Sequence, residues 1–305
     1  MIPAPEPGIY RGVPYTEYDQ WDAVRSSFLW KLRTKSPRHA QHEREHPKAP
    51  TPALKFGILL HLAVLEPARF AESTIAEPED APRRPSQRQR DAKKPSPGTI
   101  ESIEFWDAWE EQAAGKLVVT ASDMEKVRQM DEAIRIQQCS GYVAGGSAEV
   151  CLVWPDRETG ILCKARLDYL HEGWDVAIVD VKTTEDASFG AFQRDLYSYG
   201  YFQTAAFYMD GYETITGVRP KVFTWLAVEK DEPHVAKPWD ADERLALVPG
   251  QASYADALET YAECVRTGVW PAYGEGPGVL GLSPWALKRE GFNLFSAVAG
   301  SGVQG

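Results

Sequence analysis

The chain has 305 residues, of which 43% are hydrophobic, and it carries a formal net charge of −11. This length is sufficient for one large core, and the 10 Trp, 13 Tyr and 11 Phe exclude an intrinsically disordered chain. The acidic balance argues against a general nucleic-acid coat. It leaves room for an enzyme that binds a polyanion through metal ions and one local basic patch.

No stretch has the apolar length needed to span a bilayer. The start, MIPAPEPGIY, lacks the basic and apolar regions of a signal peptide, so we expect a cytoplasmic protein without a membrane partner. The cysteines are scattered without a CxxC pair, at Cys139, Cys151, Cys163 and Cys264. This pattern is typical of reduced thiols and supplies neither a zinc ribbon nor an iron–sulfur ligand set.

The first 140 residues are predicted to be mainly helical. Candidate N-caps are Ser26 or Ser27 for an early helix and Thr120 or Ser122 for a later one. Residues 76–99 form a polar, proline-rich stretch. A loop of this length is uncommon in a compact domain unless it has a function. The predicted helical segments are 15–46, broken at Pro37, then 53–70, 100–114 and 121–140.

A run of strands follows, separated by the turn sequences PDRETG and HEGW, and it predicts a β-meander. The order of helices, meander, helix and strand predicts an α/β fold with a mixed sheet flanked by helices. The predicted strands are 148–154, 161–170, 175–184 and 221–230, and the predicted helices are 188–209 and 241–267, the latter broken at VPG.

Asp180 and Lys182 interrupt the otherwise apolar strand IVDVKTT, residues 178–184. Side chains alternate across a strand, so both residues share the face of Ile178. One interpretation is a charge pair at the point where the strand leaves the core. A second interpretation depends on the strand that precedes it.

That preceding strand carries Asp168 in CKARLDYL, and a tight turn joins it to the strand of Asp180. If the two strands pair, both carboxylates project beside Lys182, where like charges repel and are costly to bury without a counter-ion. Mg²⁺ or Mn²⁺ removes that repulsion, and a lysine beside metal-bound water can orient it or take its proton. The pattern therefore predicts metal-assisted phosphodiester hydrolysis.

Two further motif matches lack the context that their chemistry needs. HEREH, residues 42–46, matches the zinc-protease pattern but runs directly into Pro47 and a polar linker. GPGVLG, residues 276–281, matches a glycine-rich dinucleotide pattern but has no strand before it. We assign no function to either.

The segments RLDYL and IVDVKTT resemble the core of the PD-(D/E)XK nuclease superfamily. Within it, the chain is similar to the exonuclease VIII (RecE) type, related to the RecB nuclease domain and phage λ exonuclease. The resemblance covers residues 9–273 and also rests, in the family's order, on SSFLWKLRTKSPRHA, GILLHLAVLEP, AEVCLVW, YGYFQTAAFY, FTWLAVEKDEP and GVWPAY.

This resemblance implies a restriction-endonuclease-like core in a single domain, residues 1–273. That domain would contain a helical part over about 15–140 and a catalytic sheet over about 148–230. Residues 274–305 would form an irregular tail.

The resemblance also implies a set of metal ligands: His61, Asp168, Asp180 and the main-chain carbonyl of Val181. They would hold one or two Mg²⁺ or Mn²⁺ ions, without an iron–sulfur cluster. The residue before Asp168 is Leu167 and not the proline of the superfamily's name. His61 lies on an apolar helix, so an ordinary hydrogen-bonded core histidine is an open alternative.

The remaining roles implied by the resemblance concern the reacting groups. Lys182 would act on the attacking water, and Glu149 would help hold a second metal or its waters. Gln203 would position Lys182 or the scissile phosphate. The family's tyrosine is replaced by Phe207, and Tyr208 comes one residue later, which predicts that its ring faces elsewhere. A solvated Glu149 and an ordinary helix-surface Gln203 are open alternatives.

The stretch RRPSQRQRDAKK, residues 83–94, contains six basic residues. Such a run is either a solvated loop or an arm that follows the DNA backbone. The candidate DNA-binding residues are Arg83, Arg84, Arg88, Arg90, Lys93 and Lys94.

Together these features predict a Mg²⁺-dependent deoxyribonuclease. The resemblance implies a 5'-3' double-strand exonuclease of phage or prophage recombination. It would act at double-stranded DNA ends as a homo-oligomeric ring and pass single strands to an annealing protein. The alternatives are an endonuclease of the same superfamily, a catalytically silent DNA-binding module, and a structural protein with a charged surface strand.

Overall fold

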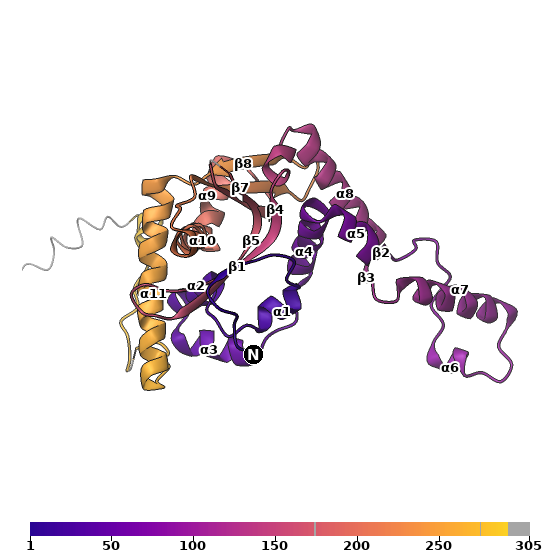
Figure 1. The fold of residues 1–305 in the computed structure, drawn as a ribbon. Helices are drawn as coiled ribbons and strands as arrows, with labels where there is room; N and C mark the ends of the chain where they lie inside the picture. Colours follow the sequence, from indigo (N-terminus) through magenta and orange to yellow (C-terminus); the bar gives the residue numbers. More distant parts are fainter. Residues whose placement is uncertain (174, 275, 292–305) are drawn as a thin grey trace, which may run out of the picture. The chain divides into compact units, whose positions relative to one another are not determined.

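A six-stranded mixed sheet organises residues 1–270 in the computed structural model, which describes residues 1–173, 175–274 and 276–291 (Figure 1). The strand order is β1-β4-β5-β6-β7-β8, and only the β6–β7 pair is parallel. This confirms the predicted mixed sheet. The strands are β1 (Gly8–Tyr10), β4 (Ser147–Pro155), β5 (Leu162–His171), β6 (Ala177–Thr184), β7 (Val222–Glu229) and β8 (Ala236–Asp240).

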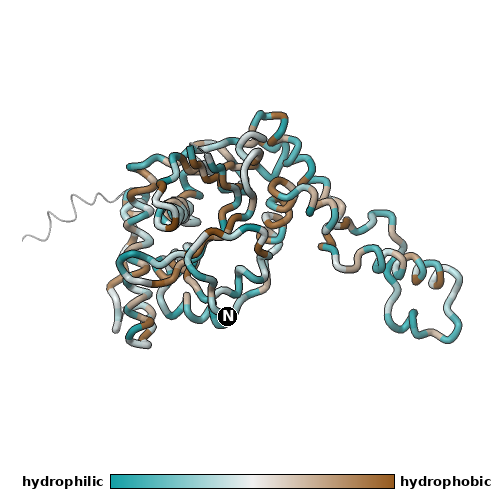
Figure 2. Tube along the Cα trace, viewed as in Figure 1, coloured by the Kyte–Doolittle hydropathy of each residue, from teal (hydrophilic) through white to brown (hydrophobic). Residues whose placement is uncertain are grey.

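Helices cover both faces of this sheet. The helices of residues 1–270, including two that lie away from the sheet (α6 and α7), are α1 (Tyr15–Gln20), α2 (Ser26–Thr34), α3 (Pro37–Glu45), α4 (Pro52–Leu65), α5 (Pro67–Ser73), α6 (Gln87–Arg90), α7 (Pro97–Ala113), α8 (Ala121–Ile136), α9 (Phe189–Ser198), α10 (Tyr201–Thr216) and α11 (Val248–Thr267), with a 3₁₀ turn η1 (Ser140–Val143) and a π-helical turn η2 (Glu243–Leu247). Hydrophobic residues concentrate on the strands and on α4 (Figure 2).

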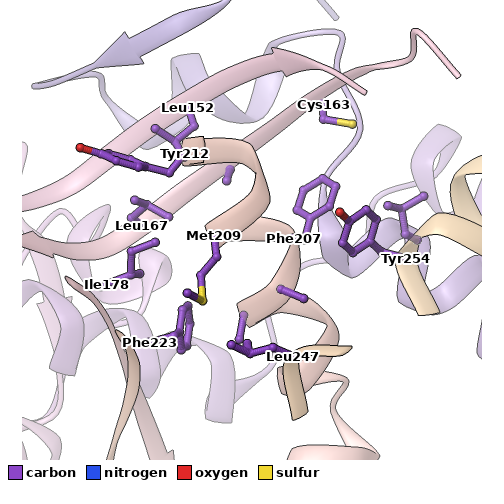
Figure 3. Close-up of a cluster of buried hydrophobic side chains, with 14 of the residues drawn as sticks. Leu152, Cys163, Leu167, Ile178, Phe207, Met209, Tyr212, Phe223, Leu247 and Tyr254 are labelled. Atoms are coloured by element: carbon purple, nitrogen blue, oxygen red, sulfur yellow. The ribbon is translucent and has the colours of Figure 1, made fainter. Parts of the chain in front are cut away.

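The first face of the sheet packs against α2, α10 and α11. Figure 3 shows Leu167 and Ile178 of the strands beside Met209 of α10, with Phe207 of the same helix next to Tyr254 of α11. All five side chains are buried. Burial of large apolar side chains is the main stabilising contribution to such a layer.

The second face packs against α4 and α8. Val179 and Val181 of β6 lie in one cluster with Leu60 of α4 and Met130 of α8. Ile178 belongs to the opposite cluster, as the alternation of side chains along a strand requires. The strand that carries Asp180 is therefore covered on both sides.

Capping residues and prolines determine where several helices begin or end. Thr120 caps α8 by accepting a hydrogen bond from Asp123 N at 3.0 Å, as predicted. The cap predicted for α2 is wrong, since Arg25 occupies that position and Ser26 is the first helical residue. Pro67 ends the predicted 53–70 helix early because it starts the separate helix α5.

The helix predicted over 188–209 is two helices, α9 and α10. Gly200 separates them with a left-handed φ of 69°, and a Cβ atom there would lie 2.5 Å from the Trp30 ring. Only glycine adopts that backbone conformation without strain at so close an approach. The contact with Trp30 is tertiary, so the periodicity of the sequence does not reveal the break.

The proline-rich stretch after residue 76 is an ordered excursion. It leaves the main body at β2 (Thr74–Ala76) and returns at β3 (Leu117–Val119), and these two strands pair in parallel. Helices α6 and α7 lie between them. Trp106 Nε1 donates to Pro82 O at 2.8 Å, and the Arg84 guanidinium lies 4.0 Å from the Trp106 ring centroid. The loop is therefore fastened to α7.

Residues from Pro271 onward form a second unit. Its described residues include one helix, α12 (Pro284–Arg289), within the tail expected to be irregular. Position 275 and residues 292–305 of that tail lie outside the described residues. Across the described ranges, no helix combines the length and apolar character required to cross a membrane.

Gly250 sets how closely α11 approaches α10. A Cβ atom there would lie 2.2 Å from the carbonyl oxygen of Phe202, so Gly250→Ala must push the helices apart. We expect the free energy of unfolding to fall by about 1–3 kcal/mol, as for other overpacked cores. Gly57→Ala is the matched control in α4, because its Cβ would meet only Thr183 Oγ1 at 4.0 Å. Chemical denaturation of both variants measures the difference, and equal stability would contradict this account.

Candidate active site

The candidate site lies where β5 and β6 separate. The two strands pair only through Tyr169–His171 and Ala177–Val179. In that register the next residues along are Asp168 and Asp180. Beyond them β5 takes another partner, since Lys164 N donates to Val24 O at 2.7 Å. Both aspartates therefore lie at the point where β5 and β6 diverge, which we call the fork.

The Asp168 side chain takes the place of a main-chain hydrogen-bond acceptor that the separated strand no longer provides. Its Oδ2 accepts a hydrogen bond from Val181 N at 2.8 Å. Burial raises the pKa of the Asp168 carboxyl to about 8, and the nearby Asp180 adds to the rise. Two acidic groups this close in a buried position favour a bound cation.

Asp180 and Lys182 form a buried ion pair. Lys182 Nζ lies 2.6 Å from Asp180 Oδ2 and compensates its charge. Among the described residues, Asp180 Oδ2 accepts no hydrogen bond from a further group. Burial lowers the pKa of Lys182, but Asp180 and Asp168 outweigh it and raise the pKa above its usual range. Lys182 therefore keeps its positive charge in the metal-free protein.

His61 reaches this site from α4. Its Nε2 lies 2.9 Å from Val181 O, and its Nδ1 lies 3.7 Å from Asp168 Oδ1. Burial lowers the pKa of the imidazole, and the neighbouring Lys182 lowers it further. The neutral imidazole is the form that ligates metals. The structure therefore brings together all four predicted metal ligands.

Glu149 stands opposite Asp168 on β4, between the pairs Ala148–Tyr169 and Val150–Leu167. It has a left-handed φ of 54°, a conformation that costs a non-glycine residue about 1–3 kcal/mol and is concentrated at functional sites.

The Glu149 side chain is directed at the fork but is not free. Burial and the charge of Asp168 raise its pKa, whereas Arg166, which forms a short ion pair with it, lowers it. Arg166 was not a predicted site residue.

These donors fit a divalent cation. Three carboxylates, one neutral imidazole and one carbonyl are hard or borderline ligands, and an oxygen-rich set suits Mg²⁺ or Mn²⁺. Across the described part of the chain, no three such side chains already converge as a metal-binding group. Two of the carboxylates instead form ion pairs with Arg166 and Lys182. Asp180 Oδ2, which accepts no hydrogen bond in the described residues and lies against the Lys182 ammonium, is an oxygen that a divalent cation could share with that lysine.

Gln203 is not brought to Lys182, contrary to the expectation from sequence. Its side chain is fully buried, with Nε2 donating to Ser26 O at 3.1 Å and Oε1 accepting from Ser253 Oγ at 2.8 Å. The amide therefore links α10 to α2 and α11. With these partners, its contribution is to hold the helical layer together.

Two tyrosines of α10, Tyr201 and Tyr208, lie near the charged residues of the fork, where Gln203 was expected. The Tyr201 ring centroid is 5.2 Å from Lys182 Nζ, and burial raises the Tyr201 pKa to about 12. Tyr208 was expected to face elsewhere, yet it lies close enough to Asp180 and Asp168 for their charges to help raise its pKa, after burial as the main cause. The helical periodicity of the sequence does not predict that Tyr201 lies beside Lys182, because the backbone break at Gly200 sets the direction of the Tyr201 side chain.

The six basic residues of 83–94 divide into two groups. Arg84 pairs with Glu110 at 2.6 Å and Arg90 pairs with Asp107 at 2.6 Å, so both serve the fold of the excursion. The other four are exposed and have no ion pair within the described residues: Arg83, Arg88, Lys93 and Lys94. Of the predicted DNA-binding set, only these four have a free charge.

One comparison with solved structures agrees with this architecture. The structure is similar to that of a provisionally assigned exonuclease from Eubacterium rectale, with a TM-score of 0.53 and 12% identity, covering 91% of this chain and 98% of that chain. A second solved structure, SSO0001, aligns with a TM-score of 0.30 and 11% identity over 73% of this chain and 98% of its own. No curated protein matches the sequence.

A family model matches residues 26–278, a span that contains all the residues assembled at the fork. Its description is a PDDEXK-like domain, which names two acidic residues and a lysine, as in Asp168, Asp180 and Lys182. Members of this nuclease superfamily generally use divalent metals. The fold and the family support a nuclease, and the chain belongs to the family of PDDEXK-like domains of unknown function, DUF3799.

Proposed function

We propose that this protein is a metal-dependent deoxyribonuclease that hydrolyses DNA phosphodiester bonds. The observation that carries the proposal is the convergence of Asp168, Asp180, Lys182 and His61 at the fork between β5 and β6. A purely structural ion pair would explain Asp180 and Lys182. It would not explain a second buried carboxyl group and a neutral imidazole beside them.

The chain's own groups have separate tasks in this reaction. Asp168, Asp180, His61 and the Val181 carbonyl would hold Mg²⁺ or Mn²⁺. The bound cation supplies Lewis-acid stabilisation of the charge that develops on the phosphate and lowers the pKa of the attacking water. Glu149 would help hold a second ion or its waters, and its position opposite Asp168 across β4 and β5 supports this role.

Lys182 orients the attacking water and stabilises the phosphate oxygens as an ammonium. An ammonium held at this position by Asp180 supports this electrostatic role. The Tyr201 ring, 5.2 Å from Lys182 Nζ, limits the positions that the ammonium can take. Gln203 lies outside this group because its amide is engaged by Ser26 and Ser253.

We further propose that cleavage begins at the ends of double-stranded DNA and runs 5'-3', in the cytoplasm, during phage or prophage recombination. The support is the resemblance to the exonuclease VIII type and the fold shared with a provisionally assigned exonuclease. The same resemblance supports a homo-oligomeric ring that passes single strands to an annealing protein.

Cleavage assays on linear and on covalently closed duplex DNA distinguish an exonuclease from an endonuclease and from a silent binding module. With Mg²⁺ we expect the linear form to be degraded, the closed circle to survive, and chelator to stop the reaction. Asp180→Asn keeps the side-chain volume while removing a ligand charge, so the rate on linear DNA should fall at least about 100-fold. Gel assays of both substrates measure this outcome.

The control is Asp175→Asn, an exposed aspartate just before the same strand, which should cleave at the wild-type rate. A folded Asp180→Asn variant that cuts as fast as the wild type would refute the site. Rapid nicking of closed circles would instead identify an endonuclease.

Asp168→Asn should stabilise the metal-free protein. The amide keeps an acceptor for Val181 N while removing an acidic group whose ionisation burial and Asp180 oppose. We expect the melting temperature in chelator to rise by roughly 1.5–2 °C, which corresponds to about 1 kcal/mol for a chain of this size. Mn²⁺ should raise the melting temperature of the wild type but not that of the variant. A variant less stable than the wild type in chelator would be inconsistent with charge repulsion at the fork.

The four exposed cations of 83–94 should contribute to DNA binding as phosphate contacts. Replacing Arg83, Arg88, Lys93 and Lys94 with serine should flatten the log–log salt dependence of duplex affinity by up to about 3.6, at about 0.9 per contact. Arg84→Ser is the control, because Arg84 is engaged by Glu110 and Trp106. Fluorescence anisotropy across a salt series measures the slope, and an unchanged slope would assign the stretch to a solvated loop.

A further inference from the structure

The junction of α9 and α10 exposes aromatic rings to solvent. Tyr197 is 68% exposed and Tyr199 is 61% exposed. Exposed apolar surface that is clustered, and not scattered, marks interaction sites. These two tyrosines lie two residues apart on one short segment, next to the break at Gly200.

The exposed rings are the outer end of an aromatic row that reaches the candidate active site. Tyr199 stacks on Tyr201 with a centroid distance of 5.4 Å and an interplanar angle of 29°. The Tyr201 ring in turn lies 5.2 Å from Lys182 Nζ. Two contacts therefore connect a solvent-exposed ring with the lysine proposed to act on the scissile phosphate.

Tyr197 begins a second stack beside the first. Its ring is nearly parallel to that of Phe202, at 6.2 Å and 10°, and Phe202 meets Trp30 edge to face at 5.7 Å. Trp30 is the residue that approaches Gly200. One break in the helix thus sets the directions of both stacks.

The backbone that carries these rings is ordered. Tyr199 N donates to Asp195 O at 3.0 Å, and Gly200 N donates to Tyr197 O at 3.2 Å. Tyrosine has only two side-chain torsions to restrict, so a ring on a fixed backbone offers contact area at low entropic cost. The surface is therefore pre-organised for a flat, rigid partner.

We propose that Tyr199 and Tyr197 form a stacking platform for unpaired nucleotides of the DNA strand being cut, a proposal that rests on the nuclease function above. The chemistry of the occupant follows from continuity with the site. A phosphate at Lys182 belongs to a nucleotide chain, and its neighbouring base lies within reach of the Tyr201–Tyr199 row. Bases inside a duplex are stacked on each other and offer no free face, whereas unpaired bases stack on aromatic side chains whatever their sequence.

The platform gives the enzyme a preference for frayed or single-stranded ends over blunt ends. The strand that enters the site leaves its partner before cleavage, and the tyrosines compensate for the base stacking lost at that step. Phe189 does not belong to the platform, although it is 64% exposed on α9, because its ring contacts Trp239 of β8 at 5.8 Å. It provides a matched control.

Binding in chelator tests the proposal without hydrolysis. Two hairpin duplexes are compared, one blunt and one with unpaired terminal nucleotides that include 2-aminopurine, whose fluorescence is quenched by stacking. We expect the wild type to quench the probe and to bind the unpaired end more tightly. Tyr199→Leu keeps an apolar side chain without the ring face and should weaken that binding on the order of 5- to 150-fold. Tyr199→Phe and Phe189→Leu should behave like the wild type.

Wild-type affinity and quenching in both Tyr199→Leu and Tyr197→Leu would overturn the platform. Thermal melts identify any variant that fails to fold, and the other variant then decides. Cleavage of linear DNA by the wild type is scored separately. A wild type that never cuts DNA refutes the nuclease function, whereas a wild type that cuts normally while the leucine variants bind normally refutes only the platform.

Discussion

The separation of β5 from β6 after the Tyr169–Val179 pair is the constraint on which the site depends. A strand that leaves its neighbour exposes main-chain N–H and C=O groups, and buried groups of this kind need new partners. Val181 shows how the need is met. Its N–H binds the Asp168 carboxylate and its carbonyl faces His61. The side chains proposed to bind metal are thus also those that complete the interrupted hydrogen bonding of the sheet.

Electrostatics imposes a second requirement at the same place. Asp168, Asp180 and Glu149 bring three carboxyl groups together in a buried region, where their ionisation is costly unless cations compensate the charge. Lys182 and Arg166 supply the compensation in the metal-free protein. The arrangement also explains why the acidic side chains point toward cationic neighbours and do not already form a chelating group.

The sequence was sufficient for the features that depend on local pattern. Alternation along IVDVKTT places Asp180 and Lys182 on one face, and the short turn after Asp168 makes the two acidic strands neighbours. The contact between His61 and Val181 was accessible only through family resemblance, since 120 residues separate them. Neither pattern nor resemblance revealed the left-handed backbone of Glu149, the engagement of Gln203 by Ser26 and Ser253, or the position of Tyr201 beside Lys182. Each of these depends on close approach between distant segments, which a single sequence does not encode in any local signal.

The parallel pairing of β2 with β3 has a consequence for how this chain can change over evolutionary time. The excursion of residues 77–116 departs and rejoins at two strands that lie side by side, about 4.8 Å apart. Parallel neighbours need a crossover of about a dozen residues or more, so most of the insert can be lost, lengthened or replaced while that minimum is kept and α4, α8 and the sheet stay in place. The phosphate contacts proposed for residues 83–94 can therefore change without altering the residues at the fork, because the two groups are encoded in separable stretches of the gene.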